Sequence, residues 1–270
     1  LVFDLAALSN DPVGELNPEK TFEINYLGRV RVATESKKAG VKQYVLASSA
    51  SIYGQQSTIA TETSTVKPIT AYSKANRNAE IDVLKLHDES FCVSVLRFSS
   101  LYGVSPRMRF DMSVNEMVLN LFKDKKIVVR GKNNQRPFLH VKDAVDAYKL
   151  IINGNKNKIG GEIFNVGDEK QNYSIGSLAK NISKSIDVNC DLEFGDNNDH
   201  RSYTASFKKI RDILNYKSTR TLEQGSLEIY ESLKSGKITD SIETITLKWY
   251  QYIQSNPKYL KIHSINDKFL

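Results

Sequence analysis

Short apolar runs alternate with longer amphipathic stretches along the first hundred residues. The apolar runs have the length of buried strands and lie at residues 1–7, 42–49 and 91–103. Between them, helix-like patterns span 17–40 and 71–89, and Pro18 and Gly40 stand near the start and at the end of the first. Strands that alternate with helices of this length predict parallel β-α-β units, and hence a doubly wound, Rossmann-like α/β sheet.

After Gly103 the alternation loosens. Helical patterns lie at 113–125, 141–154, 174–186 and 206–214, and short strands at 127–131 and 161–167. We therefore predict a first domain at 1–103 and a second, smaller α/β domain at 104–270. We expect some segments of the second to return to the first sheet.

Composition narrows the class of protein. The chain has 270 residues, 40% of them hydrophobic, and no apolar run approaches the roughly 18 residues that span a bilayer. The net charge of +7 comes mostly from dispersed lysines, so we expect neither a nucleic-acid nor a membrane partner. Cys92 and Cys190 form neither a disulfide framework nor a metal site, which favours a reducing, cytoplasmic setting and no metal.

A cluster of hydroxyl residues follows the second apolar strand, in "ASSASIYG" at 47–54. Ser48, Ser49 and Ser51 gain nothing from burial unless each hydroxyl finds a partner. Because ligands of α/β proteins bind at the carboxyl ends of the strands, these serines are candidates to face one.

The glycine pattern leads to a prediction about the start of the chain. None of the 14 forms the G-x-G-x-x-G pattern of a pyrophosphate-binding loop. If the fold binds a dinucleotide, that loop is expected upstream of Leu1, and the sequence is then a fragment that lacks the first β-α units.

Several motifs occur together and in order. They are "DLAALS", "SSASIYG", "AYSKAN", "RFSSLYG", "RGKNNQRPFLHVKD", "GEIFNVG" and "RSYTASFKKI". Together they resemble the extended short-chain dehydrogenase/reductase family, in its NAD-dependent nucleotide-sugar epimerase/dehydratase branch. The resemblance implies that 1–103 is a partial dinucleotide-binding Rossmann domain and that 104–270 mainly binds substrate.

The resemblance also implies catalytic residues. Ser49 matches the catalytic hydroxyl, and Tyr72 the acid/base that takes a proton from a sugar hydroxyl. Since a free tyrosine has a pKa near 10, the family lowers it with a lysine four residues later. Here that position holds Asn76, and the lysine nearby in sequence, Lys74, points about 200° away around an ideal helix. Either the charge of the oxidised nicotinamide suffices to lower the Tyr72 pKa, or Lys74 reaches the site through a distorted first turn of the helix, or activity is reduced.

Further site residues follow from the same resemblance. Those expected at the cofactor, NAD or alternatively NADP, are Leu5, Ala6, Ala7, Asn25, Ser48, Tyr72 and Phe98. Those expected at the substrate are Ser51, Ser100, Arg109, Asn115, Arg136 and Arg201. The arginine fork suits a nucleotide diphosphate.

The reaction type stays open within the family. Family dehydratases carry an acidic pair where this chain has Ala50 and Ser51, and related decarboxylases carry a glutamate where it has Ser51. We therefore expect an epimerase of a nucleotide sugar, and the alternatives are a 4-keto-sugar reductase or a cofactor-binding scaffold with impaired catalysis. The resemblance also implies a homodimer.

Overall fold

A four-stranded parallel sheet lies at the centre of the computed structural model, which describes residues 1–196 and 199–264. Its strands, in spatial order, are β1 (Val2–Asp4), β2 (Gln43–Ser49), β3 (Cys92–Phe98) and β7 (Glu162–Val166). In this register Phe98 pairs with both Ser49 and Val166, so the strands end at one edge. The predicted α/β class with a Rossmann-like parallel sheet is confirmed, and β7 comes from the second half of the chain.

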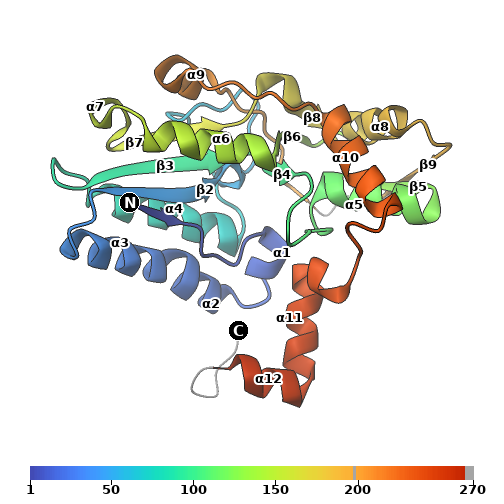
Figure 1. Ribbon diagram of the computed structural model, residues 1–270, viewed down its shortest axis with the longest axis horizontal. Coiled ribbons are helices and arrows are strands. Elements are labelled where there is room, and N and C mark those ends of the chain that lie inside the picture. Colours follow the sequence, from blue (N-terminus) through green and yellow to red (C-terminus); the bar gives the residue numbers. More distant parts are fainter. Residues whose placement is uncertain (197–198, 265–270) are drawn as a thin grey trace.

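Helices cover both faces of the sheet (Figure 1). On one face lie α3 (Arg29–Lys38) and α4 (Ala71–Leu84), and on the other lies α6 (Val141–Ile152). Tyr44 and Leu46 of β2 join the core beneath α3 and α4, whereas Val45 between them joins the core on the α6 side. Burial on both faces explains why these strands are continuously apolar.

The helix expected at 17–40 is present in three consecutive parts. They are α2 (Pro18–Phe22), the π-helical segment η1 (Glu23–Gly28) and α3. Asn17 caps α2, because its side chain accepts a hydrogen bond from the backbone N–H of Lys20. The π-helical turn between α2 and α3 was not predicted, since a wide turn leaves no mark in an apolar periodicity.

The second half of the chain has its own apolar core. It contains α5 (Ser113–Asp124), β5 (Lys126–Arg130), α8 (Ile175–Ile186), β9 (Asp191–Gly195) and α10 (Leu222–Lys234). A three-stranded sheet, β4 (Ser100–Tyr102), β6 (Gln135–His140) and β8 (Asn172–Ser174), joins this core to the region of α6. Of these elements, β6, β8, β9 and α10 were not predicted.

The remaining elements are short or lie towards the C-terminus. They are α1 (Asp11–Gly14), η2 (Ala50–Tyr53), α7 (Lys156–Ile159), η3 (Glu169–Gln171), α9 (Lys208–Leu214), η4 (Ile242–Thr244), α11 (Thr246–Ser255) and α12 (Pro257–His263). In Figure 1, α11 and α12 extend below the second half. No helix of the described ranges 1–196 and 199–264 is long and apolar enough to cross a membrane.

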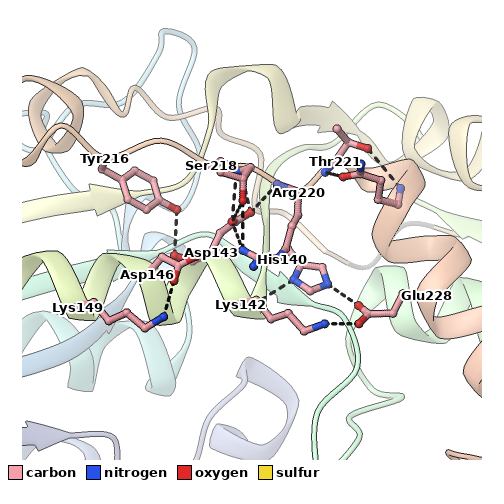
Figure 2. Close-up of polar contacts among 12 residues, drawn as sticks. His140, Lys142, Asp143, Asp146, Lys149, Tyr216, Ser218, Arg220, Thr221 and Glu228 are labelled. Carbon is pink, nitrogen blue, oxygen red and sulfur yellow. Dashed lines mark hydrogen bonds and ion pairs between the residues drawn. The ribbon is translucent and has the colours of Figure 1, made fainter.

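A polar cluster at the start of α6 fixes the chain that returns after α9 (Figure 2). The fully buried carboxylate of Asp143 accepts hydrogen bonds from three consecutive residues, Ser218, Thr219 and Arg220. The imidazole of His140 caps α6 and also lies 2.8 Å from the carboxylate of Glu228 on α10. The cluster thereby anchors α10 to a helix that packs on the main sheet.

Candidate active site

A cavity of about 820 Å³ lies at the carboxyl edge of the parallel sheet, where the second half of the chain faces it. Most of the residues expected at a site line this cavity: Leu5, Ala7, Ser48, Ser49, Ser51, Tyr72, Phe98, Ser100, Arg109, Asn115, Arg136 and Arg201. Lys74, Asn76, Ala6 and Asn25 are outside the lining. One cavity thus collects side chains that are up to about two hundred positions apart in the sequence.

Ser49 and Tyr72 both line the cavity, and the Ser49 hydroxyl lowers the pKa of the Tyr72 phenol. Ser49 ends β2, and its hydroxyl oxygen accepts the backbone N–H of Ser51 at 3.1 Å. That bond leaves the Ser49 hydroxyl proton for another acceptor. A serine and a tyrosine placed in this way can act together on one substrate oxygen.

The position of Tyr72 is fixed by the start of α4. Thr70 and Ser73 form a capping box around it, and the Thr70 hydroxyl also donates to Asp11 at 2.5 Å. Gly14 of α1 faces the tyrosine so closely that an added Cβ would lie 2.9 Å from the Tyr72 Cβ. A side chain at position 14 would therefore displace Tyr72.

Opposing influences act on the Tyr72 phenol. Burial and the carboxylate of Asp11 raise its pKa above the ordinary value. The positive charge of Arg29, the hydrogen bond with Ser49 and the charge of Arg109 lower it. Arg29 exerts the largest lowering influence, and sequence reasoning had not singled it out.

Lys74 does not reach the cavity. The helix is regular from Ala71 onward, and Lys74 is exposed on its outer face. The distorted first turn that would bring this lysine round is absent from α4. Asn76, in contrast, is 1% exposed and is hydrogen-bonded to the backbone carbonyl of Tyr72 at 2.9 Å. Lys74 is therefore corrected to a solvent-facing residue.

Ser48 and Ser51 differ in their partners. The Ser48 hydroxyl donates at 2.6 Å to Glu80, a buried carboxylate held by Arg97. The Ser51 hydroxyl is buried and has no hydrogen-bond partner among the described residues, although it lines the cavity. An unsatisfied buried hydroxyl at a cavity is free to bind a ligand.

The residues expected at the cofactor either line the cavity or support the loop after β1. Leu5 and Ala7 line the cavity, as does Phe98, whose ring centroid lies 5.2 Å from that of Tyr148. Asn25 is fully buried, and its amide bonds both the backbone N–H and the carbonyl of Leu8. Asn25 therefore shapes the loop after β1 rather than lining the cavity.

Arg109 lines the cavity together with Asn115 and Ser100. The Arg109 guanidinium bonds both carboxylate oxygens of Asp111 and the backbone of Ser9. Asn115 links the backbone N–H of Gly103 to the carbonyl of Arg109. Arg109 is thus oriented from two directions, while its guanidinium still lines the cavity.

Arg136 and Arg201 share a carboxylate. Both pair with Asp199, at 2.9 and 2.7 Å, and Arg201 also pairs with Asp11. The ring of Tyr203 lies 5.2 Å from the Arg136 guanidinium and holds it from one face. The carboxylates of Asp11 and Asp199 were not predicted, because Asp11 meets Arg201 across 190 positions and Asp199 meets Arg136 across 63.

The donor set suits an anion and not a metal. No group of three or more histidine, cysteine or acidic residues able to hold a metal ion occurs within 1–196 and 199–264. The cavity combines apolar contacts after β1 and β3, an unpartnered hydroxyl on Ser51 and six arginines: Arg29, Arg107, Arg109, Arg130, Arg136 and Arg201. Its volume lies in the roughly 300–1,000 Å³ range of small-molecule and cofactor sites.

Residues 1–167 match the model of the NAD dependent epimerase/dehydratase family. A UDP-glucuronate 4-epimerase from Thermodesulfobacterium geofontis is 28% identical over 88% of this chain and 75% of its own length. UDP-glucuronic acid decarboxylase 2 from Arabidopsis thaliana is 26% identical over 83% of this chain. The match spans about half of that relative's length, 51%.

Solved structures show the same fold. MoeE5 in complex with UDP-glucuronic acid and NAD superposes with a TM-score of 0.78 at 24% identity, covering 87% of this chain and 79% of MoeE5. RMD from Pseudomonas aeruginosa, complexed with NADPH, gives 0.77 at 20% identity, covering 87% and 81%.

Proposed function

Because this chain belongs to the NAD dependent epimerase/dehydratase family, we propose that it is a nucleotide-sugar epimerase that oxidises one sugar hydroxyl transiently. The observation that carries the proposal is the placement of Ser49 beside Tyr72 in a cavity that arginines also line. Tyr72 takes the proton of the sugar hydroxyl, and Ser49 polarises the same oxygen. Bound NAD would accept and return a hydride.

The remaining lining residues have binding roles in this proposal. Leu5, Ala7 and Phe98 provide apolar contacts for the cofactor, for which NADP is the alternative. Arg136 and Arg201 bind the nucleotide diphosphate, and Ser51, Ser100, Arg109 and Asn115 orient the sugar. The relatives named for UDP-glucuronate activities make UDP-hexoses and UDP-hexuronic acids the first substrates to try.

The test is an incubation of the protein with NAD and a panel of UDP- and dTDP-sugars. Products are separated by chromatography while absorbance near 340 nm is recorded. Inversion of a sugar without net NADH formation supports an epimerase. Turnover that consumes reduced cofactor with a keto sugar identifies the reductase alternative. Bound NAD with every sugar unchanged favours a scaffold, and Tyr72→Phe is the inactive control.

A further inference from the structure

Arg29 is a buried cation at the edge of the cavity. It opens α3, is 3% exposed and lines the cavity on the side of Tyr72. Its Nε donates to the carbonyl of Ala6 at 3.2 Å and lies 3.6 Å from the buried carboxylate of Asp4. A buried charge is costly to keep, so its retention beside a reactive group calls for an explanation.

Asn76 links this cation to the catalytic helix. Its side-chain oxygen accepts a hydrogen bond from Arg29 Nη1 at 2.7 Å, and its amide donates to the backbone carbonyl of Tyr72 at 2.9 Å. The neutral amide therefore bridges the guanidinium and the first turn of α4. A lysine at position 76 would bring a second positive charge within bonding distance of Arg29.

The charge of Arg29 acts on Tyr72 directly. Tyr72 is the group that must lose its proton in the proposed reaction, and burial and Asp11 both oppose that loss. Among the groups that favour loss of the Tyr72 proton, Arg29 has the strongest effect, followed by the Ser49 hydroxyl and the charge of Arg109. Asn76 brings no charge of its own, so it cannot replace Arg29 in this role.

We propose that Arg29, held by Asn76, is the positioning residue that stabilises the ionised form of Tyr72 in this protein. The inference rests on the proposed function, in which Tyr72 is the acid/base. The inference explains why position 76 holds an asparagine where the family has a lysine. The positive charge comes from α3 instead of α4, and Asn76 is neutral because it holds that charge.

The first test measures Tyr72 itself and needs no turnover. In the full chain, labelled with ¹³C at tyrosine Cζ, the Tyr72 resonance is assigned by its loss in Tyr72→Phe and followed against pH. Arg29→Gln is expected to raise the Tyr72 pKa, and Arg29→Lys to keep it near the wild-type value. Arg31→Gln, which removes an exposed charge from the same helix, is the matched control and is expected to leave it unchanged.

The second test exchanges the source of the charge. Asn76→Lys alone places two cations together and is expected to lower stability, whereas Arg29→Gln/Asn76→Lys is expected to restore the wild-type Tyr72 pKa. Should Arg29→Gln fail to fold with Asp4 left unpaired, Asp4→Asn/Arg29→Gln removes both charges and keeps the test valid. A folded Arg29-deficient variant with an unaltered Tyr72 titration would overturn the proposal.

Activity gives a separate outcome. With a substrate in hand, Arg29→Gln should lower kcat near pH 7 by on the order of tenfold for each unit by which the Tyr72 pKa rises, with KM nearly unchanged and kcat recovering at higher pH. If Tyr72 responds as expected but no sugar is inverted, the proposed function fails and this inference stands. If sugars are inverted but Tyr72 does not respond, the inference fails alone.

Discussion

The two sides of the cavity hold their polar residues by different means. The sheet wall carries Ser48, Ser49 and Tyr72, and beneath it Glu80 and Arg97 form an ion pair that is 0% and 1% exposed. The arginine wall consists of Arg109, Arg136 and Arg201, and the exposed fraction of their carboxylate partners runs from 9% for the Asp111 side chain and 13% for Asp11 to 43% for Asp199. The Glu80–Arg97 pair is fixed by burial, whereas solvent reaches the Asp199 carboxylate that Arg136 and Arg201 share.

This difference suits two tasks. Proton transfer needs groups held in place before the substrate arrives, and the capped helix start and the strand end provide that on the sheet wall. In the proposed function the arginines must be released to the ligand, and a diphosphate would take the place of carboxylates such as Asp199 and Asp11. The sheet wall should therefore control kcat, and the arginine wall KM.

Removing the Tyr72 hydroxyl is the most damaging change for activity. Tyr72→Phe is expected to lower kcat by roughly 10²–10⁴-fold, because general acid–base catalysis contributes about that much. The free energy of unfolding should change little, since the ring keeps its packing. Steady-state kinetics with an accepted nucleotide sugar measure this effect, and Tyr252→Phe on the exposed surface is the control. Near-normal kcat in Tyr72→Phe would remove Tyr72 from the mechanism.

Breaking the ion pair beneath the sheet wall is the largest change for stability. Arg97→Ala leaves Glu80 buried with less compensation and is expected to cost about 3–5 kcal/mol of unfolding free energy. Arg77, which pairs with the same carboxylate from a half-exposed position, is the matched control. Arg77→Ala should cost about 1 kcal/mol or less. Urea denaturation measures both, and equal costs would contradict the conclusion that burial makes the Glu80–Arg97 pair important.

The arginine wall should affect binding more than chemistry. Arg201→Gln is expected to raise KM for the nucleotide sugar by roughly 10–100-fold, because a hydrogen bond to a charged group contributes about 1.5–3 kcal/mol. Arg211→Gln removes an exposed arginine that pairs with Glu169 and is the control. Initial rates over a range of substrate concentrations separate KM from kcat. A fall in kcat alone would place Arg201 in the chemical step.

The smallest expected effect is on the pH dependence of stability, through Asp199, the carboxylate between Arg136 and Arg201. Burial opposes ionisation of Asp199, but the bond and charge of Arg201 and the charge of Arg136 lower its pKa to about 2. Since this value lies below the ordinary one of about 3.9, the carboxylate adds stability above pH 4, and that contribution is lost between about pH 4 and pH 2. The stability difference between wild type and Asp199→Asn should therefore shrink from pH 6 to pH 3, as chemical denaturation would measure. A constant difference would contradict this pairing.

The residues of the sheet wall could be predicted from sequence because their positions depend on residues close to them in the chain. The apolar strand that ends in Ser48 and Ser49, and the motif around Tyr72, both lie within a few residues of the side chains they place. The element boundaries followed only in part, because the strand expected at 91–103 divides into β3 and β4 of different sheets and the π-helical turn at Glu23–Gly28 was missed. Local patterns thus located the main strands and the residues at their ends.

The partners of these side chains could not be predicted. Arg29 meets Asn76 across 47 positions, and Arg201 meets Asp11 across 190, so neither pair leaves a spacing that a single sequence reveals. Sequence reasoning looked for a positive charge on the helix of Tyr72 and therefore considered Lys74. The structure places the charge on α3, which only the packing of two helices against the sheet can determine.

The most direct test of the proposed chemistry follows one hydrogen atom. A nucleotide sugar that the protein inverts is prepared with deuterium at the carbon that changes configuration, and the product is examined by mass spectrometry and NMR. Transient oxidation at the Tyr72 site predicts inverted product that keeps the deuterium, with no net NADH formed, and no product from Tyr72→Phe. Inverted product with hydrogen from solvent at that carbon would contradict hydride transfer and, with it, the proposed mechanism.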